Sequence, residues 1–182
     1  MAWTTPRTWV AGETVTDTIM NTHVRDNLAY LGTGIIRLDV NTTAVGNVGA
    51  GADDLMTYTL PASTLGVDGM GVRITAWGYT ANNANAKTLG LYFGATAFSS
   101  ATLTTGTAGR WVMTAVLIRS GATTQLGFPL MVTHDATSKT LGPGVPGAVA
   151  ETLSGAVVIK MTGTATANDD IVQSLMLVEL IR

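Results

Sequence analysis

From Ile35 to the C-terminus, apolar and polar residues alternate with a period of two along most of the chain. Within 71–80, Val72, Ile74 and Ala76 fall on one side of an extended strand, and the residues between them fall on the other. The pattern predicts eight strands, at 35–40, 55–60, 71–80, 88–93, 111–119, 125–133, 155–162 and 171–181. We therefore expect a mainly β domain over 35–182.

The segments between these strands are rich in Gly, Asn, Asp and Thr, a composition that is typical of turns. Turns are predicted at 45–54, 81–86 and 102–110. A loop is predicted at 141–147, because its Gly and Pro residues exclude both a helix and a paired strand. The pattern places no helix between successive strands, so these strands are expected to pair antiparallel. The fold predicted for 35–182 is an antiparallel, jelly-roll-like β-sandwich.

Residues 14–31 have a helical period instead, so one short α-helix is expected before the sandwich. Thr14 or Thr16 can cap its start, and Asp17 lies in the first turn, where the helix dipole favours an anion. Gly32 follows as a stop signal. The chain is thus predicted to consist of an N-terminal arm and helix, 1–34, and a β-domain, 35–182.

An apolar stripe runs along this helix through Met20, Val24, Leu28 and Leu31. Within it, the spacing of Met20, Val24, Asn27 and Leu31 is that of a coiled-coil seam, in which Asn27 would fix the register of a small bundle. The alternative is that the stripe packs on the β-domain and that Asn27 caps or bridges locally. Two heptads do not decide between these interpretations.

The arm before the helix contains two tryptophans, Trp3 and Trp9, with Pro6 between them. Large aromatic side chains are costly to leave in water, so they are expected either to fold back on this chain or to dock on another protein. We favour docking, because an N-terminal arm is a convenient place to graft an anchor. The candidate attachment residues are Trp3, Pro6, Trp9, Met20, Val24, Asn27 and Leu31.

Two of the predicted strands, 111–118 and 171–178, are apolar on both faces. An antiparallel sheet usually has one face in water, so these strands indicate that one sheet is covered from outside. The cover is either the N-terminal helix or neighbouring copies of the chain, and we favour copies for part of it. The candidate subunit-interface residues are Trp111, Val116, Ile118, Leu175, Met176, Leu177 and Val178.

Composition supports a surface buried against other subunits. Charged residues make up 12% of the 182 residues, against roughly 25% in an average domain, and the formal net charge is −2. Without a basic run, a nucleic-acid partner is not expected. The chain has no Cys, and no stretch is apolar and long enough to span a membrane. It has no secretory signal pattern either, so we expect a soluble protein made in a cytoplasm.

Candidate chemistry is sparse. His23 and His134 lie far apart in sequence, without the paired spacing of metal ligands. The acid pairs at 53–54 and 169–170 suit turns, because neighbouring carboxylates on a strand point apart and do not face each other across a cleft. We therefore expect no enzyme activity, no metal and no cofactor.

Two stretches resemble virion proteins of tailed bacteriophages. The first 31 residues resemble the N-terminus of small virion proteins of this kind, through Trp3, Pro6, Arg7, Trp9, Asn21 and the runs 11–16 and 24–28. A second stretch resembles the β-domain of phage fibre-like proteins, through 68–69, 72–78, 81–88, 91–94, Trp111 and 118–125. The resemblance implies a trimeric virion component that is fixed to the particle by its N-terminal segment.

On this resemblance we expect a non-enzymatic structural protein on the virion surface, made in the host cytoplasm. A capsid decoration or head-fibre protein is favoured, because the chain lacks a long repetitive shaft. The alternative is a tail fibre or tail-tip protein that binds a receptor, with a host surface glycan as a possible ligand. The expected partners are further copies of the chain in a homotrimer and either the major capsid protein or a tail or baseplate protein. A depolymerase is disfavoured because no facing acid pair is evident.

Overall fold

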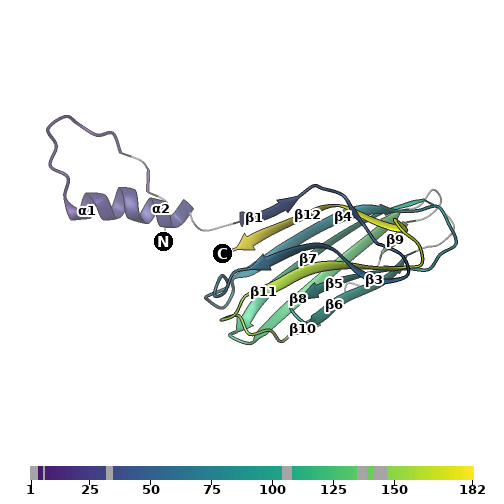
Figure 1. Ribbon diagram of the computed structural model, residues 1–182. Coiled ribbons are helices and arrows are strands. Elements are labelled where there is room, and N and C mark those ends of the chain that lie inside the picture. Colours follow the sequence, from purple (N-terminus) through teal and green to yellow (C-terminus); the bar gives the residue numbers. More distant parts are fainter. Residues whose placement is uncertain (1–3, 6, 32–34, 104–107, 135–138, 142–146) are drawn as a thin grey trace.

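The computed structural model describes residues 4–5, 7–31, 35–103, 108–134, 139–141 and 147–182. The protein is mainly β, with antiparallel sheets and a short helical segment before them, which confirms the predicted fold class (Figure 1). The strands are β1 (Ile35–Asn41), β2 (Val45–Gly46), β3 (Gly51–Leu60), β4 (Gly71–Thr80), β5 (Lys87–Phe93), β6 (Thr96–Leu103), β7 (Gly109–Gly121), β8 (Thr124–His134), β9 (Lys139–Leu141), β10 (Gly147–Val149), β11 (Val157–Ala165) and β12 (Ile171–Ile181).

The strands form two packed sheets. The large sheet has the order β1-β12-β4-β7-β8-β10, with β2 beside β12 and β9 beside β8. The small sheet has the order β3-β11-β5-β6. The chain crosses repeatedly between the sheets, from β3 to β4, from β4 to β5 and from β11 to β12, which is why strands distant in sequence become neighbours.

All eight predicted strands are present, and the bounds of β4 and β12 agree with the prediction. The short strands β2, β9 and β10 and the longer β6 were not predicted. In β6, only Ala101 and Leu103 are buried hydrophobics among the described side chains, so the strand carries a weak alternating signal. The predicted turns at 45–54 and 102–110 are wrong at their ends, where backbone pairing extends β3, β6 and β7. The predicted loop at 141–147 is wrong at its ends, because Leu141 belongs to β9 and Gly147 belongs to β10, and 142–146 lie outside the described residues.

The predicted helix is present over 17–31. It consists of α1 (Asp17–Met20), a π-helical turn (Asn21–Arg25) and α2 (Asp26–Leu31). Thr16 is its N-cap, and its hydroxyl accepts a hydrogen bond from the Ile19 amide at 3.3 Å. In Figure 1 this segment lies beyond the end of the sandwich at which β1 begins and β12 ends.

The core fills the space between the two sheets. On β7, Trp111, Met113, Ala115 and Leu117 all point inward and are almost fully buried. Gly78 on the neighbouring strand makes room for the indole, since a Cβ at this position would lie 2.7 Å from the Trp111 ring. The inward rows of β4, β5, β11 and β12 are equally buried, so the sandwich completes a hydrophobic core within one chain.

A network of buried polar groups closes the end of the sandwich that carries the β4–β5 loop. The Lys87 side chain is fully buried, and its ammonium donates to the Asn83 side-chain oxygen at 2.7 Å and to the Asn85 carbonyl at 3.0 Å. Asn83 in turn donates to the buried Asp170 carboxylate, which also accepts from the Asn85 amide group at 2.9 Å. Asn83 therefore joins a buried cation to a buried anion.

Burial on its own raises the pKa of Asp170, but the hydrogen bonds from Asn83, Asn85 and the Ala167 and Thr166 amides outweigh it. Together they lower the pKa of Asp170 from its ordinary value of 3.8 to about 2. The folded protein thus favours the ionised carboxylate, which stabilises the native state when the pH is above the unfolded pKa.

We expect Asn83→Ala to lower the free energy of unfolding by about 2–3 kcal/mol, because hydrogen bonds to charged groups contribute roughly 1.5–3 kcal/mol each. Urea unfolding at neutral pH measures this loss. The matched control is Asn82→Ala in the same loop, where the side chain is exposed and a change below about 0.5 kcal/mol is expected. Equal effects of the two substitutions would show that the network does not stabilise the fold.

The stabilising contribution of Asp170 should be lost between about pH 4 and pH 2, as the pH falls through the unfolded and then the folded pKa. Urea midpoints measured across this range should fall less steeply for Asp170→Asn than for the wild type, because the variant has no carboxylate to protonate at this position. If the urea midpoints of the wild type and of Asp170→Asn fall equally steeply with decreasing pH, the lowered pKa of Asp170 is contradicted.

Candidate interaction surfaces

The N-terminal arm is fastened to its own helix by Asn27. The Thr4 amide donates to the Asn27 side-chain oxygen at 3.0 Å, and the Asn27 amide group donates back to the Thr4 carbonyl at 2.9 Å. Asn27 is 6% exposed, so this reciprocal pair satisfies a buried amide. Of the two interpretations considered for Asn27, the local bridge is the one observed within the chain.

A second set of contacts shapes the arm between Thr4 and the helix. The Arg7 guanidinium lies over the Trp9 ring, 5.2 Å from its centroid, and forms an ion pair with Glu13. The Glu13 amide donates to the Val10 carbonyl at 3.1 Å, which closes a turn. These contacts shape residues 7–13 into a turn before the helix.

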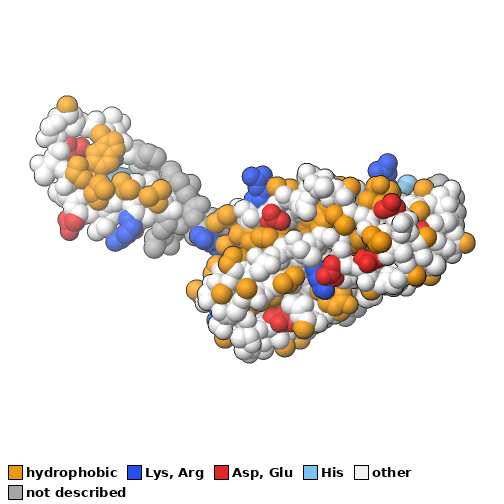
Figure 2. Space-filling view, in the orientation of Figure 1, with side chains coloured by type: hydrophobic (Ala, Val, Ile, Leu, Met, Phe, Trp, Pro, Cys, Tyr) orange, Lys and Arg blue, Asp and Glu red, His pale blue; other side chains and the backbone are white. Residues whose placement is uncertain are grey.

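These contacts leave much of the segment's apolar surface in water. Trp9 is 49% exposed despite the cation above it, Met20 is exposed and Val24 is half-buried. Three further residues, Val10, Val15 and Leu28, are exposed as well, although none of them was predicted to attach the protein. Hydrophobic side chains gather on the face of this segment seen in Figure 2.

The remaining candidate attachment residues cannot be placed on this surface. Trp3 and Pro6 lie outside the described residues, and Leu31 ends α2 with its side chain outside them as well. Each hydrogen bond described for 4–31 has both partners within that segment.

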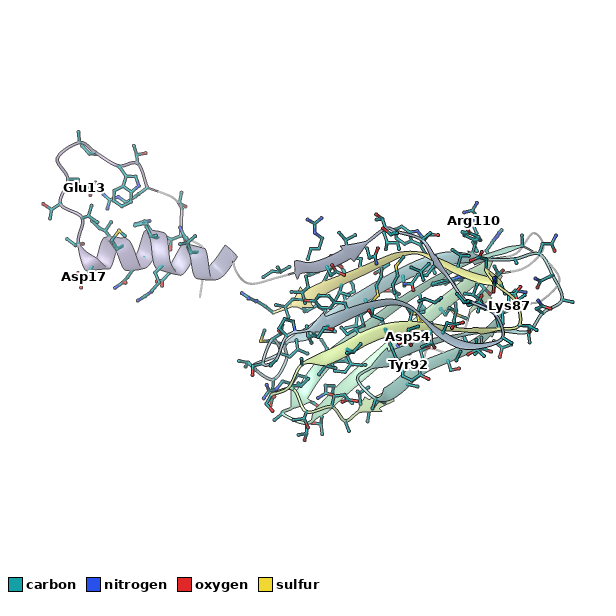
Figure 3. All side chains as sticks on the ribbon, viewed as in Figure 1. Glu13, Asp17, Asp54, Lys87, Tyr92 and Arg110 are labelled. Carbon is teal, nitrogen blue, oxygen red and sulfur yellow. The ribbon has the colours of Figure 1, made fainter. Side chains whose placement is uncertain are left out.

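The outer face of the small sheet is polar. Thr57, Thr59, Thr162 and Thr164 alternate with inward residues along β3 and β11. At its centre the Lys160 ammonium pairs with Asp54 at 2.8 Å and lies 5.4 Å from the centroid of the Tyr92 ring. Figure 3 labels Asp54 and Tyr92 close together on this face. Such a surface is suited to water.

The outer face of the large sheet is apolar over several strands. Strand register places Leu175, Trp77, Val112 and Val132 in one row across β12, β4, β7 and β8. Nearer the N-terminal end of β4, the paired residues of β7 and β8 form two further apolar rows, Val116 with Phe128 and Ile118 with Leu126. Trp77, Val112, Leu126 and Phe128 are all more than 40% exposed. We call this surface the apolar face.

The candidate interface residues divide between this face and the core. Trp111, Met176 and Val178 are almost fully buried between the sheets of one chain, so they offer no surface to a neighbour, and this part of the prediction is corrected. Val116, Ile118, Leu175 and Leu177 lie on the apolar face and are half-buried. The predicted interface did not include Trp77, Val112, Leu126 or Phe128, although the alternation along 71–80 already placed Trp77 opposite the core residues.

The two candidate acid pairs take part in local structure. Asp53 accepts from the Val48 amide at 2.9 Å, and the Asp169 amide donates to the Asn47 carbonyl at 2.9 Å. Within the described ranges, no three His, Asp or Glu side chains gather as a metal site would require. His23 lies in the π-helical turn, and His134 ends β8. No helix in the part of the chain that the structure describes is long and apolar enough to cross a membrane.

The chain was compared with protein families, curated proteins and solved structures. No protein-family model and no curated protein matches the chain. Among solved structures, a lectin described as UEA-II complexed with galactose is similar at 8% identity, with a TM-score of 0.34, over 82% of this chain and 93% of that one.

If the apolar face joins copies of the chain, Val112→Glu should dissociate the oligomer, because a buried unpaired charge costs several kcal/mol. An increase of at least about a hundredfold in the dissociation constant corresponds to about 3 kcal/mol. Light scattering over a concentration series measures it.

The matched control is Val158→Glu on β11. Val158 is 40% exposed against 44% for Val112, but it lies on the polar face of the small sheet. This variant should keep the wild-type mass. A wild type that remains monomeric at micromolar concentration, or equal dissociation of both variants, would contradict assembly through the apolar face.

Proposed function

We propose that this chain is a non-enzymatic structural protein of a tailed-bacteriophage virion: a trimeric capsid decoration or head-fibre protein attached through its N-terminal segment. The observation that carries the proposal is the distribution of exposed apolar side chains. They concentrate on the segment 4–31 and on one of the two outer faces of the sandwich, while the other face is polar. Two separate apolar surfaces suit two different partners.

The apolar face is the surface that we assign to the trimer. It is a sheet surface with few charged side chains, and the ion pair on it, Arg73 with Glu179 at 2.7 Å, neutralises itself. Copies of such a surface can approach one another without strong repulsion. The low overall charge of the chain has the same consequence for many subunits set close together on a shell.

The N-terminal segment is the surface that we assign to the particle. Its fold is maintained by Asn27 and by the Arg7–Glu13 ion pair, so Trp9, Met20 and Leu28 are presented on an ordered scaffold. The resemblance of residues 1–31 to the N-termini of small phage virion proteins supports the same role. The partner would be the major capsid protein.

A tail fibre or tail-tip receptor-binding protein is the second candidate. It is favoured by an open hollow lined by Tyr79, Thr80, Ala108, Gly109 and Arg110, at the end of the large sheet opposite the N-terminal segment. We call it the Tyr79–Arg110 hollow. Counting copies per purified particle by mass spectrometry separates the two candidates, because a capsid repeats its docking site over the whole shell and a tail tip does not.

Deleting residues 1–31 should leave a folded sandwich, because its core lies within 35–182, and should abolish binding to particles stripped of this protein. Trp9→Ala in the full chain should weaken binding at least about tenfold, as truncation of an interface tryptophan commonly does. Sedimentation of the protein with stripped particles measures both.

The control for this experiment is Val158→Glu, which alters the polar face of the sandwich and should bind particles like the wild type. Wild-type binding by the truncated protein would contradict attachment through the N-terminal segment. Aggregation of the truncated protein would show that the segment belongs to the fold instead.

A further inference from the structure

The Tyr79–Arg110 hollow is a depression of about 490 Å³ on the large sheet. Tyr79 and Arg110 are directly opposite each other across β4 and β7, and Thr80 is opposite Gly109. Ala108 and Gly109 have little or no side chain, so the wall beside Arg110 is low. The Gly109 amide donates to the Thr80 hydroxyl at 3.1 Å, which ties the two strands together beneath the opening.

The polar groups of this hollow are free to contact a ligand. Tyr79 is 47% exposed and Arg110 is exposed as well. Among the described residues, no acid pairs with Arg110, whereas Arg7, Arg25, Arg73 and Arg119 each have a carboxylate partner. His134 lies beside Arg110 on β8 in the same cross-strand row. The row combines an aromatic ring with cationic and imidazole groups.

The backbone beneath the hollow is held in place from the core side. Trp111 follows Arg110 and is 1% exposed, with its ring packed against Gly78, which precedes Tyr79. The polar network of Asn83, Lys87 and Asp170 closes the adjoining end of the sandwich. The strands that carry Tyr79 and Arg110 are therefore packed and hydrogen-bonded from the core side, as a preformed binding site requires.

The hollow lies at the end of the sandwich remote from the N-terminal segment. Ile35 pairs with Ile181 and Ile181 with Gly71 at one end of the large sheet, while Tyr79 pairs with Arg110 at the other. Figure 3 labels Arg110 at the end away from α1. A protein anchored by its N-terminal segment would direct this end toward the surroundings.

We propose that the Tyr79–Arg110 hollow binds an acidic sugar, with the sugar carboxylate on Arg110 and the apolar face of the pyranose ring on Tyr79. A guanidinium forms paired hydrogen bonds with a carboxylate, and the exposed ring offers a flat apolar surface beside it. A nucleic acid is a poor fit, because a lone arginine does not replace a series of phosphate counterions. The proposal holds for a head fibre and for a tail fibre alike.

The full-length chain can be titrated by NMR with the methyl glycosides of N-acetylneuraminic acid and glucuronic acid. Methyl glucoside and acetate serve as the neutral sugar and the bare carboxylate. We expect saturable binding of at least one acidic sugar, and at least about tenfold weaker binding of methyl glucoside and acetate, since each retains only one of the two contacts. Comparing the affinities for the two acidic sugars shows whether the hollow prefers a sialic acid or a uronic acid.

Arg110→Gln and Tyr79→Ala should each lower the affinity for the acidic sugar at least about tenfold. The matched control is Arg37→Gln, which removes an exposed arginine at the opposite end of the same sheet and should leave the affinity unchanged. Thermal unfolding of the three variants verifies that they fold. If Arg110→Gln does not fold, the affinity of Tyr79→Ala still tests the proposal.

Several results would overturn the proposal. These are the absence of saturable binding of either acidic sugar, equal binding of methyl glucoside or acetate, and unchanged affinity in Arg110→Gln. If Arg110→Gln changes the molar mass in solution and leaves sugar binding unchanged, the row belongs to the polar rim of a subunit interface and the sugar site does not exist.

Discussion

A two-layer sandwich buries only one face of each sheet, so each outer face must either suit water or be covered by another protein. In this chain the two outer faces differ. Lys160, Asp54 and threonines make the outer face of the small sheet polar, while Trp77, Val112 and Phe128 make that of the large sheet apolar. Because the core is complete without the apolar face, its composition is not needed for folding one chain. This asymmetry is the basis on which we propose assembly through the apolar face.

The N-terminal segment follows a different constraint. A short helix has marginal stability in water by itself, so tertiary contacts must support it. Asn27 supplies such a contact by exchanging two hydrogen bonds with the Thr4 backbone, and Arg7 bridges Trp9 and Glu13. The polar interactions thus stabilise the segment internally, and its exposed apolar side chains remain available for a partner. If the segment attaches the protein to the particle as proposed, these contacts, already formed before docking, would lower the entropy lost on binding.

The two ends of the sandwich differ in what lies beside them. The N-terminal segment lies beyond the end at which β1 begins and β12 ends. The other end carries a buried network in which Asn83 links the Lys87 ammonium to the Asp170 carboxylate. Burying both charges is costly unless their hydrogen bonds are satisfied, and the loop residues supply those bonds. The strand β4, which ends at Thr80, leads directly into this hydrogen-bonded loop, and β7, which begins at Gly109, pairs with it.

The period-two pattern by itself determined the eight main strands and the antiparallel fold class, because alternation is a local property. For the helical segment the sequence offered Thr14 or Thr16 as the cap, and the structure selects Thr16. The period-two pattern also determined which residues share a face, as for Trp77 opposite Ile74. It could not determine which face meets the other sheet, so Trp111, Met176 and Val178 were assigned to an interface although they are core residues. The bond from Asn27 to Thr4, the network around Asp170 and the pairing of Tyr79 with Arg110 were decided only by the tertiary structure. Each depends on strand order or chain reversal, which bring together residues whose separation in sequence contains no local signal.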